Sequence, residues 1–332
     1  MKERTELSNG IVRRYVFTPG FRRSVLASVA AMFTLGFVLV TSSTCQNQNG
    51  QSTTGQQSGA ADWKAVEEAL GKGGSMQPGD VYKVSFPRSD LQVNVAGVQV
   101  KPALALGSWV AFKKTGDMTM VMGDLVLLEE EVTPVSTKLQ EGGVETTAVH
   151  NHVLRETPRV MYMHIHAMGD SVKIAKAIHE SLALSKTPFA APAAGNPNQE
   201  IGVDTKELDQ IMAYSGKING GVYQFSIPRA EKVTADGCEV PPSMGLATAI
   251  NFQPTGGGKA AITGDFVLIA SEVNPVIKTL RENGIEVTAL HSHMLTETPR
   301  LFFMHFWAND DAMKLARGVR AALDRMNILK SK

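Results

Sequence analysis

Residues 148–164 read AVHNHVLRETPRVMYMH, and residues 289–305 read ALHSHMLTETPRLFFMH. Both stretches contain His-x-His, a glutamate four residues later, and a further histidine eight residues after that glutamate. The offset between the copies, 291 − 150 = 141 residues, also aligns Tyr82 with Tyr223, Gly123-Asp124 with Gly264-Asp265, and Pro134 with Pro275. This period is far too long for a solenoid, so the sequence predicts two copies of one globular module.

The two modules are predicted at residues 62–187 and 201–329, joined by a Pro/Ala/Gly-rich linker at 188–200. The chain has 332 residues, of which 43% are hydrophobic, and this is enough for two domains with cores of their own. Its 33 Lys and Arg residues balance 32 Asp and Glu residues, and no basic stripe is interleaved with aromatic residues. We therefore expect no nucleic-acid partner.

Each module is predicted to have the same order of elements. In the second copy these are a strand at 260–270, a helix at 276–282 that Pro275 opens, hairpin strands at 286–294 and 301–308, and a helix at 311–326. The β-α-β-β-α order predicts an α+β fold, in which a ferredoxin-like module of the split β-α-β type, with extra N-terminal strands, occurs in tandem. We also expect the two copies to pack around a pseudo-twofold axis.

The histidines of each copy are predicted to share one face of the hairpin. Alternate residues of a strand point the same way, so His150 accompanies His152, and His291 accompanies His293. A hairpin that turns near Thr157 places His164 opposite His150. In the second copy, the register decides whether His305 lies opposite His291 or His293. Directly paired residues have Cβ atoms ~4.5–5.5 Å apart, which is close enough for two imidazoles to share an ion.

These positions predict a divalent metal site in each copy. His166 adds an imidazole in the first copy only, because Trp307 occupies the matching position. Apart from Cys45, the chain contains one cysteine, Cys238, so any metal must be held by nitrogen and oxygen ligands. Such ligands suit zinc first, with copper, manganese or iron as alternatives. The predicted ligands are His150, His152, His164, His166, His291, His293 and His305.

Glu156 and Glu297 are predicted to lie in the hairpin turns, where each could complete the metal site or serve as general base on a metal-activated water. They are the predicted catalytic residues of a metal-dependent hydrolase that acts on a cell-envelope component or a small molecule. Asp124 and Asp265, which follow a glycine at a strand end, either orient a ligand histidine or form a turn.

Two other interpretations stay open. The protein could handle copper or zinc, or bind another ligand, without catalysing a reaction. Alternatively, it could be a structural interaction module, in which the histidines form a half-buried hydrogen-bonded network. In that interpretation Glu156 pairs with Arg159, and Glu297 with Arg300, to fix the turns.

Residues 1–45 are predicted to be an export signal, in which Arg22-Arg23 precedes an apolar run and resembles a twin-arginine signal. Cys45 occupies the position expected of a lipoprotein cysteine, and the polar segment 46–61 follows it like a tether. Lipidation of Cys45, cleavage elsewhere and an uncleaved membrane anchor are alternatives. In each case we expect the modules outside the cytoplasm, either periplasmic or anchored to the membrane.

The modules resemble the LppY/LpqO family of bacterial envelope proteins, a domain of unknown function that often occurs in tandem in lipoproteins. The matching features are the Gly-Asp strand ends, the His-x-His-x3-Glu-Thr-Pro-Arg hairpins, and the pairs Met163-His164 and Met304-His305. This resemblance implies an exported or lipid-anchored protein and brings no established reaction. The His-x-His-x3-Glu spacing is also similar to the first metal motif of cupins, but the flanking helices do not suit a cupin barrel.

Overall fold

The structure, a computed structural model, describes residues 59–190 and 201–330. The predictions for the export signal and for Cys45 lie outside these residues, as do most of the tether and most of the linker. Within the described part of the chain, no helix has both the length and the apolar character needed to cross a bilayer.

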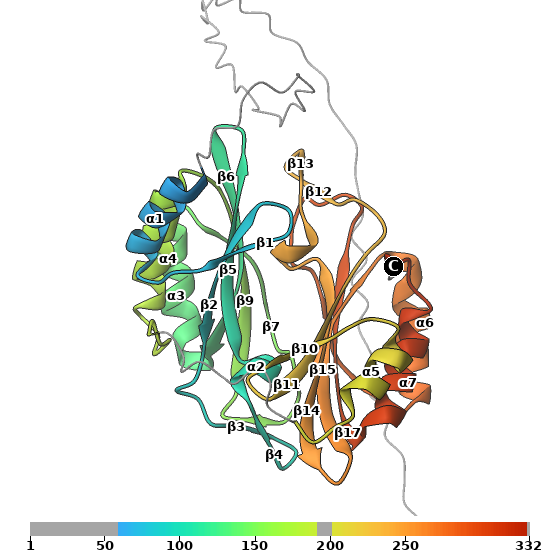
Figure 1. Cartoon of the computed structure of the whole chain (residues 1–332). Coiled ribbons are helices and arrows are strands. Elements are labelled where there is room, and N and C mark those ends of the chain that lie inside the picture. The colour runs from blue at the N-terminus through green and yellow to red at the C-terminus, as the bar shows by residue number, and fades with distance from the viewer. Residues whose placement is uncertain (1–58, 191–200, 331–332) are drawn as a thin grey trace, which may run out of the picture. The chain divides into compact units, whose positions relative to one another are not determined.

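The first repeat is an antiparallel sheet of six strands with helices on one face (Figure 1). The strands, in sheet order, are β1 (Ser75–Gln77), β2 (Val81–Pro87), β5 (Gly107–Thr115), β6 (Met118–Leu128), β9 (Val160–Gly169) and β7 (Glu145–His150). The helices are α1 (Gly59–Leu70), α3 (Glu129–Glu141) and α4 (Ser171–Leu182). An insert between β2 and β5 contains β3 (Val93–Val95), β4 (Val98–Val100) and α2 (Pro102–Ala105), and β8 (Glu156–Thr157) pairs with β3.

The second repeat has the same arrangement. Its sheet contains, in order, β10 (Lys217–Asn219), β11 (Val222–Pro228), β14 (Ala247–Gly256), β15 (Lys259–Leu268), β17 (Phe302–Asp311) and β16 (Glu286–His291). The helices are α5 (Thr205–Met212), α6 (Ala270–Glu282) and α7 (Ala312–Leu323). The insert here contains β12 (Thr234–Ala235), β13 (Cys238–Glu239) and the 3-10 helix η1 (Pro242–Met244).

In both repeats the last strand in the chain inserts between two earlier ones. Strand β9 lies between β6 and β7 and is antiparallel to both, and β17 lies in the same way between β15 and β16. The two strands that flank the inserted one are therefore parallel to each other, and α3 or α6 connects them. The predicted α+β duplication is confirmed, and the chain is rich in strands with few helices. The ferredoxin-like assignment stays a prediction.

Helix α6 begins earlier than the sequence predicts. It starts at Ala270 rather than after Pro275, which lies inside the helix. The reason is a cap formed by a buried carboxylate: Glu272 accepts a hydrogen bond of 2.9 Å from the backbone N–H of Ile269. This cap fixes the first turn, so the missing N–H of Pro275 costs the helix one internal bond without ending it.

Each sheet is buried on both faces. One face of the first sheet packs under its helices, with Val84, Phe112 and Leu125 in the core. The opposite face contacts the other repeat through two apolar clusters that contain residues of both sheets. The first cluster contains Met122 of the first repeat and Phe303 of the second. The second cluster contains Tyr162 of the first repeat and Trp307 of the second. Side chains on these inner faces are therefore held away from bulk water between the repeats.

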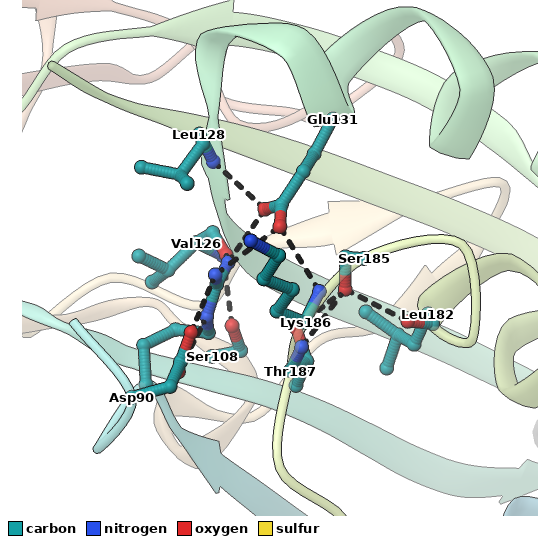
Figure 2. A network of polar contacts seen from close by, with 10 residues as sticks. Asp90, Ser108, Val126, Leu128, Glu131, Leu182, Ser185, Lys186 and Thr187 are labelled. Atoms are coloured by element: carbon teal, nitrogen blue, oxygen red, sulfur yellow. Dashed lines mark hydrogen bonds and ion pairs between the residues drawn. The ribbon is translucent and has the colours of Figure 1, made fainter.

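A buried arginine fixes the start of the helix that follows the long strand in each repeat. Arg88 donates hydrogen bonds to the backbone oxygen of Val126 at 2.9 Å and to Oε2 of Glu131 at 2.7 Å. Glu131 also accepts from the N–H groups of Leu128 and Lys186, as Figure 2 shows. The second repeat repeats this network with Arg229, Val267 and Glu272. In each repeat this network connects the loop after β2 or β11 to a strand and to the helix that follows it, which are β6 and α3 in the first repeat and β15 and α6 in the second.

Candidate metal centre

Six histidines meet between the inner faces of the two sheets. His150 and His291 end the edge strands β7 and β16, and their rings stack with centroids 3.6 Å apart. Around this pair, the ring of His164 lies 3.7 Å from that of His293, and the ring of His152 lies 3.8 Å from that of His305. The His164–His293 pair and the His152–His305 pair each combine one ring from each repeat, and their centroid distances are nearly equal. The six rings therefore follow a local pseudo-twofold arrangement in which His150 exchanges with His291.

The predicted strand register is wrong by two residues. His164 lies opposite Ala148, and His150 lies opposite Tyr162. In the second repeat, where the prediction left two registers open, His305 lies opposite Ala289 rather than His291 or His293. The segment after His150 is not a tight turn, because Glu156 and Thr157 form β8 and pair with β3 instead. A shift of two residues leaves His150 and His164 on the same face. His152 follows the end of β7, and its ring lies 5.0 Å from that of His150.

The closest groups of histidine nitrogens combine the two repeats. In one group, ligand atoms of His150, His152 and His305 all lie within 4.8 Å of one another. In the other group, ligand atoms of His150, His164 and His291 also all lie within 4.8 Å of one another. The sequence predicted one trio from each hairpin, whereas both of these groups include a histidine of the other repeat.

Two glycines orient histidines of this cluster. Nδ1 of His305 donates a hydrogen bond to the backbone oxygen of Gly264 at 2.7 Å, and His164 interacts with the backbone of Gly123 in the same way. A side chain is excluded at Gly264, because a Cβ there would lie 1.8 Å from the backbone oxygen of Ala249. With Nδ1 of His305 protonated, its Nε2 presents a lone pair, as in most metal-bound histidines.

One nitrogen pair has the spacing of ligands on a shared ion. Nε2 of His150 lies 3.3 Å from Nε2 of His305. Two imidazoles on a tetrahedral zinc, with Zn–N bonds of 2.0–2.1 Å, hold their nitrogens roughly 3.3 Å apart. The same spacing also fits a single hydrogen bond between the two rings.

The unpaired polar atoms separate these two interpretations. Among the described residues, nine buried side-chain nitrogen or oxygen atoms lack a hydrogen-bond partner, and all nine belong to histidines or to two nearby aspartates. They are Oδ1 of Asp124 and Asp265, Nδ1 of His150 and His291, and Nε2 of His152, His164, His166, His291 and His293. Buried polar groups without partners cost about 1–3 kcal/mol each. Eight of these atoms belong to the cluster or to the two aspartates beside it, and only Nε2 of His166 lies apart; a satisfied histidine network, the structural interpretation, would not leave eight atoms unpaired together.

The two aspartates border the histidines. Asp124 lies beside His164 on the neighbouring strand, and its Oδ2 is 3.7 Å from Nε2 of His152. Asp265 lies beside His305, and its Oδ2 is 3.1 Å from Nε2 of His293. Burial raises the pKa of both carboxyls, that of Asp265 to about 6, and the charge of Asp265 raises the pKa of Asp124 further. Each carboxylate is therefore poorly solvated and is stabilised by any cation placed among the rings.

The imidazoles themselves are held in the neutral form. Burial lowers the pKa of all six, and the neighbouring rings lower most of these pKa values further. Neutral imidazole is the form that ligates metals. His164, His293 and His305 are buried, whereas His150, His152 and His291 are half-buried. The stacked pair and His152 are therefore the part of the cluster nearest to solvent.

The predicted catalytic glutamates have other partners. Glu297 is buried and accepts hydrogen bonds from the N–H of Leu301 at 3.0 Å and from Arg300 at 3.3 Å. Glu156 pairs with Val95 through β8, and burial raises its pKa. Neither glutamate belongs to the histidine groups described above.

His166 lies apart from the six clustered rings. Its Nε2 lies 3.3 Å from Oδ2 of Asp236 in the second repeat, and its Nδ1 lies 3.7 Å from Oε2 of Glu145. Trp307, at the matching position, packs in an apolar cluster between the sheets. The two repeats thus differ at this position, as the sequence predicts.

Sequence reasoning missed the groups that hold the His-x-His segments in place. Thr147 donates a hydrogen bond to the backbone oxygen of His293 at 2.6 Å, and Thr288 donates to that of His152. The ring of Tyr162 stacks on His152 with centroids 3.3 Å apart, and Phe303 stacks on His293 at 3.4 Å. At the 141-residue offset, Thr147 aligns with Thr288, and Tyr162 aligns with Phe303. The alignment of the two copies therefore marked these positions, but it could not show which of them contact the other repeat.

A family model described as Domain of Unknown Function (DUF1259) matches residues 64–184 and again residues 206–325. The chain belongs to this family. Two DUF1259 domains in tandem confirm the duplication predicted from the sequence, and the clustered histidines come from both domains.

No curated protein matches the chain. Among solved structures, the DUF1259 tandem has a distant likeness to the crystal structure of a trimeric bacterial microcompartment shell protein, PduB. The sequences are 12% identical, the TM-score is 0.21, and the likeness covers 78% of this chain and 97% of the shell protein.

Proposed function

We propose that the tandem DUF1259 protein binds a divalent transition metal, zinc first, between its two domains. The observation that carries this proposal is a set of eight buried nitrogen and oxygen atoms without a hydrogen-bond partner, which all belong to the six clustered histidines or to Asp124 and Asp265. A metal ion accepts lone pairs from several of them at once and so removes the cost of burying them. Copper, manganese and iron are the alternative ions, since the donors are imidazole and carboxylate.

The ligands in this proposal come from the six clustered histidines. His150, His152 and His305 form one close group, and their pseudo-twofold counterparts are His291, His293 and His164, of which His164 and His291 form the other close group with His150. The first group and its counterparts each take a His-x-His pair from one domain and the third imidazole from the other. Asp124 and Asp265 lie next to these histidines and supply negative charge. The ion thereby links the two domains.

The test is metal analysis of the full chain, purified without a histidine tag and equilibrated with zinc. We expect at least one tightly bound ion per chain, and X-ray absorption should show only nitrogen and oxygen neighbours, at about 2.0–2.1 Å. Substoichiometric metal after equilibration at micromolar free zinc would contradict the proposal and leave the structural interpretation standing.

A metal-dependent hydrolase is the second candidate, favoured by the half-buried position of His150 and His291 and by the two carboxylates, Asp124 and Asp265, that border the same cluster. A bound ion supplies a Lewis acid that polarises water or a substrate oxygen. In this version Asp124 or Asp265 accepts the proton, because Glu156 and Glu297 lie outside the histidine groups.

For the hydrolase candidate, Asp124→Asn should lower the turnover of an activated phosphate or carboxylate ester by about 10²–10⁴-fold while zinc remains bound. The Glu156→Gln/Glu297→Gln double variant should retain the wild-type rate. The reverse pattern would return the role of base to the glutamates.

We also propose the finer assignments of location and family. The protein is an LppY/LpqO-type envelope protein with modules of the ferredoxin-like type, exported and held periplasmic or membrane-anchored, where it meets an envelope component or a small molecule. The sequence features that support this are the Arg22-Arg23 segment before an apolar run, Cys45, and the His-x-His-x3-Glu-Thr-Pro-Arg hairpins.

A further inference from the structure

A lysine breaks the symmetry of the candidate centre. Lys83 of β2 lies on the inner face of the first sheet, and its ammonium group sits 3.8 Å from the centroid of the Trp109 ring. It also donates to the backbone oxygen of Ser243, in the other domain, at 3.3 Å. Gln224 occupies the corresponding position in the second domain and donates to the backbone oxygen of Ala103. Only the first domain therefore provides a cation here.

Trp109 places this ammonium next to the histidine cluster. On the sheet, Trp109 lies directly opposite Asp124, whose Oδ2 is 3.7 Å from Nε2 of His152. Gly245 lies next to both the Trp109 ring and His293: a Cβ on Gly245 would lie 2.8 Å from Cη2 of Trp109 and 4.0 Å from Nδ1 of His293. Lys83, whose ammonium packs on the Trp109 ring, thus lies near the histidine cluster and interacts electrostatically with Asp124.

The charge of the loaded centre is not balanced by the described residues. One divalent ion offsets the two carboxylates of Asp124 and Asp265, so the ammonium of Lys83 remains in excess, and a second ion would add to this excess. Within the described residues, no carboxylate forms an ion pair with Lys83. In the metal-free chain, burial lowers the pKa of Lys83 to about 8, so the ammonium form predominates there at neutral pH. Lys83 is half-buried, and excess positive charge that is partly shielded from water is costly unless an anion compensates it.

We propose that the metal-loaded centre binds an oxyanion, a phosphate or carboxylate group, on the side of the cluster that faces Lys83. This inference rests on the proposed metal site and adds the chemical class of its ligand. Lys83 is the residue that favours a negatively charged ligand. Because the second domain has Gln224 instead of a lysine at the matching position, the anion binds on one side of an otherwise symmetric cluster.

The experiment is calorimetric titration of the zinc-loaded full chain, freed of excess zinc, with inorganic phosphate and separately with acetate. We expect binding of at least one of these anions, and the stronger of the two identifies the oxyanion class. Lys83→Gln, which copies the residue of the second domain, should weaken that binding about ten- to hundredfold, because a hydrogen bond to a charged group contributes about 1.5–3 kcal/mol. Its zinc content should stay unchanged.

Lys101→Gln is the matched control. Lys101 also donates across the domain boundary, to the backbone oxygen of Gly221 at 3.0 Å, but it lies on the insert of the first domain. This variant should bind the anion as the wild type does. Equal affinity in Lys83→Gln and wild type, or no anion binding by the zinc-loaded chain, would overturn the proposal while leaving the metal site intact. Anion binding of equal strength in the metal-free chain would overturn it as well, and a chain that takes up no zinc refutes both proposals.

Discussion

The His150→Ala/His291→Ala double variant is expected to lose tight zinc binding, with a rise in Kd on the order of a thousandfold or more. The two rings stack at 3.6 Å, and His150 belongs to both groups of nitrogens that lie within 4.8 Å of one another. Even groups that only orient a metal ligand cost 10–100-fold in affinity when removed, so two direct ligands should cost at least the product of two such losses. Because both rings are half-buried at the ends of edge strands, the substitutions should leave the sheets folded.

Zinc affinity is best measured by competition with a chelator of known Kd, and circular dichroism then reports whether the variant is folded. His166→Ala is the matched control: its ring lies near Asp236 and Glu145 rather than among the six, and we expect it to keep wild-type affinity. The wild type should gain thermal stability with rising free zinc, by about 4 kcal/mol at a thousand times the Kd, whereas the double variant should not respond. Unchanged zinc affinity in the double variant would show that the metal, if bound, lies elsewhere.

Much of the fold is encoded in patterns that a single sequence displays. The duplication follows from the constant offset between the copies, and the hairpin strands and final helix follow from local periodicity. The start of α6 did not follow, because the residue that fixes it, Glu272, is held by Arg229 from another part of the chain. A proline is a strong local signal, but here a contact distant in the sequence outweighs it.

Of the seven histidines predicted as ligands, six meet in one cluster and His166 lies apart, whereas the grouping of the six was not predictable. Strand alternation predicts His150, His152 and His164 on one face, and their rings do lie together, although β7 ends at His150 and His152 follows it. Which ring joins which depends on how two sheets pack, and no local pattern in either copy encodes that packing. For Glu297 the sequence left two roles open, a catalytic base or a partner of Arg300, and in the folded chain it accepts hydrogen bonds from Leu301 and Arg300.

Arg88→Ala is expected to destabilise the folded protein by about 3–5 kcal/mol, the usual cost of removing one partner from a buried ion pair. The side chain of Arg88 is fully buried, and it donates to Glu131 at 2.7 Å and to Asp90 at 2.9 Å. Burial would raise the pKa of Glu131, but the hydrogen bonds from Arg88, Lys186 and Leu128 outweigh it and hold this pKa below its usual value. Without the guanidinium, Glu131 keeps its charge only at a large cost or takes up a proton.

The loss should appear as a lower midpoint in urea unfolding, followed by the circular dichroism of the sheets. Arg155→Ala provides the comparison, since its ion pair with Glu286 is exposed and such pairs contribute about 0–1 kcal/mol. Arg88→Met/Glu131→Gln should recover part of the stability, because the second substitution removes the unpaired charge while the oxygen of the new amide can still accept backbone hydrogen bonds. If Arg88→Ala proved no more harmful than Arg155→Ala, the network would not be what holds the loop after β2 to α3, and the capping of that helix would have to be assigned to the Leu128 and Lys186 backbone contacts alone.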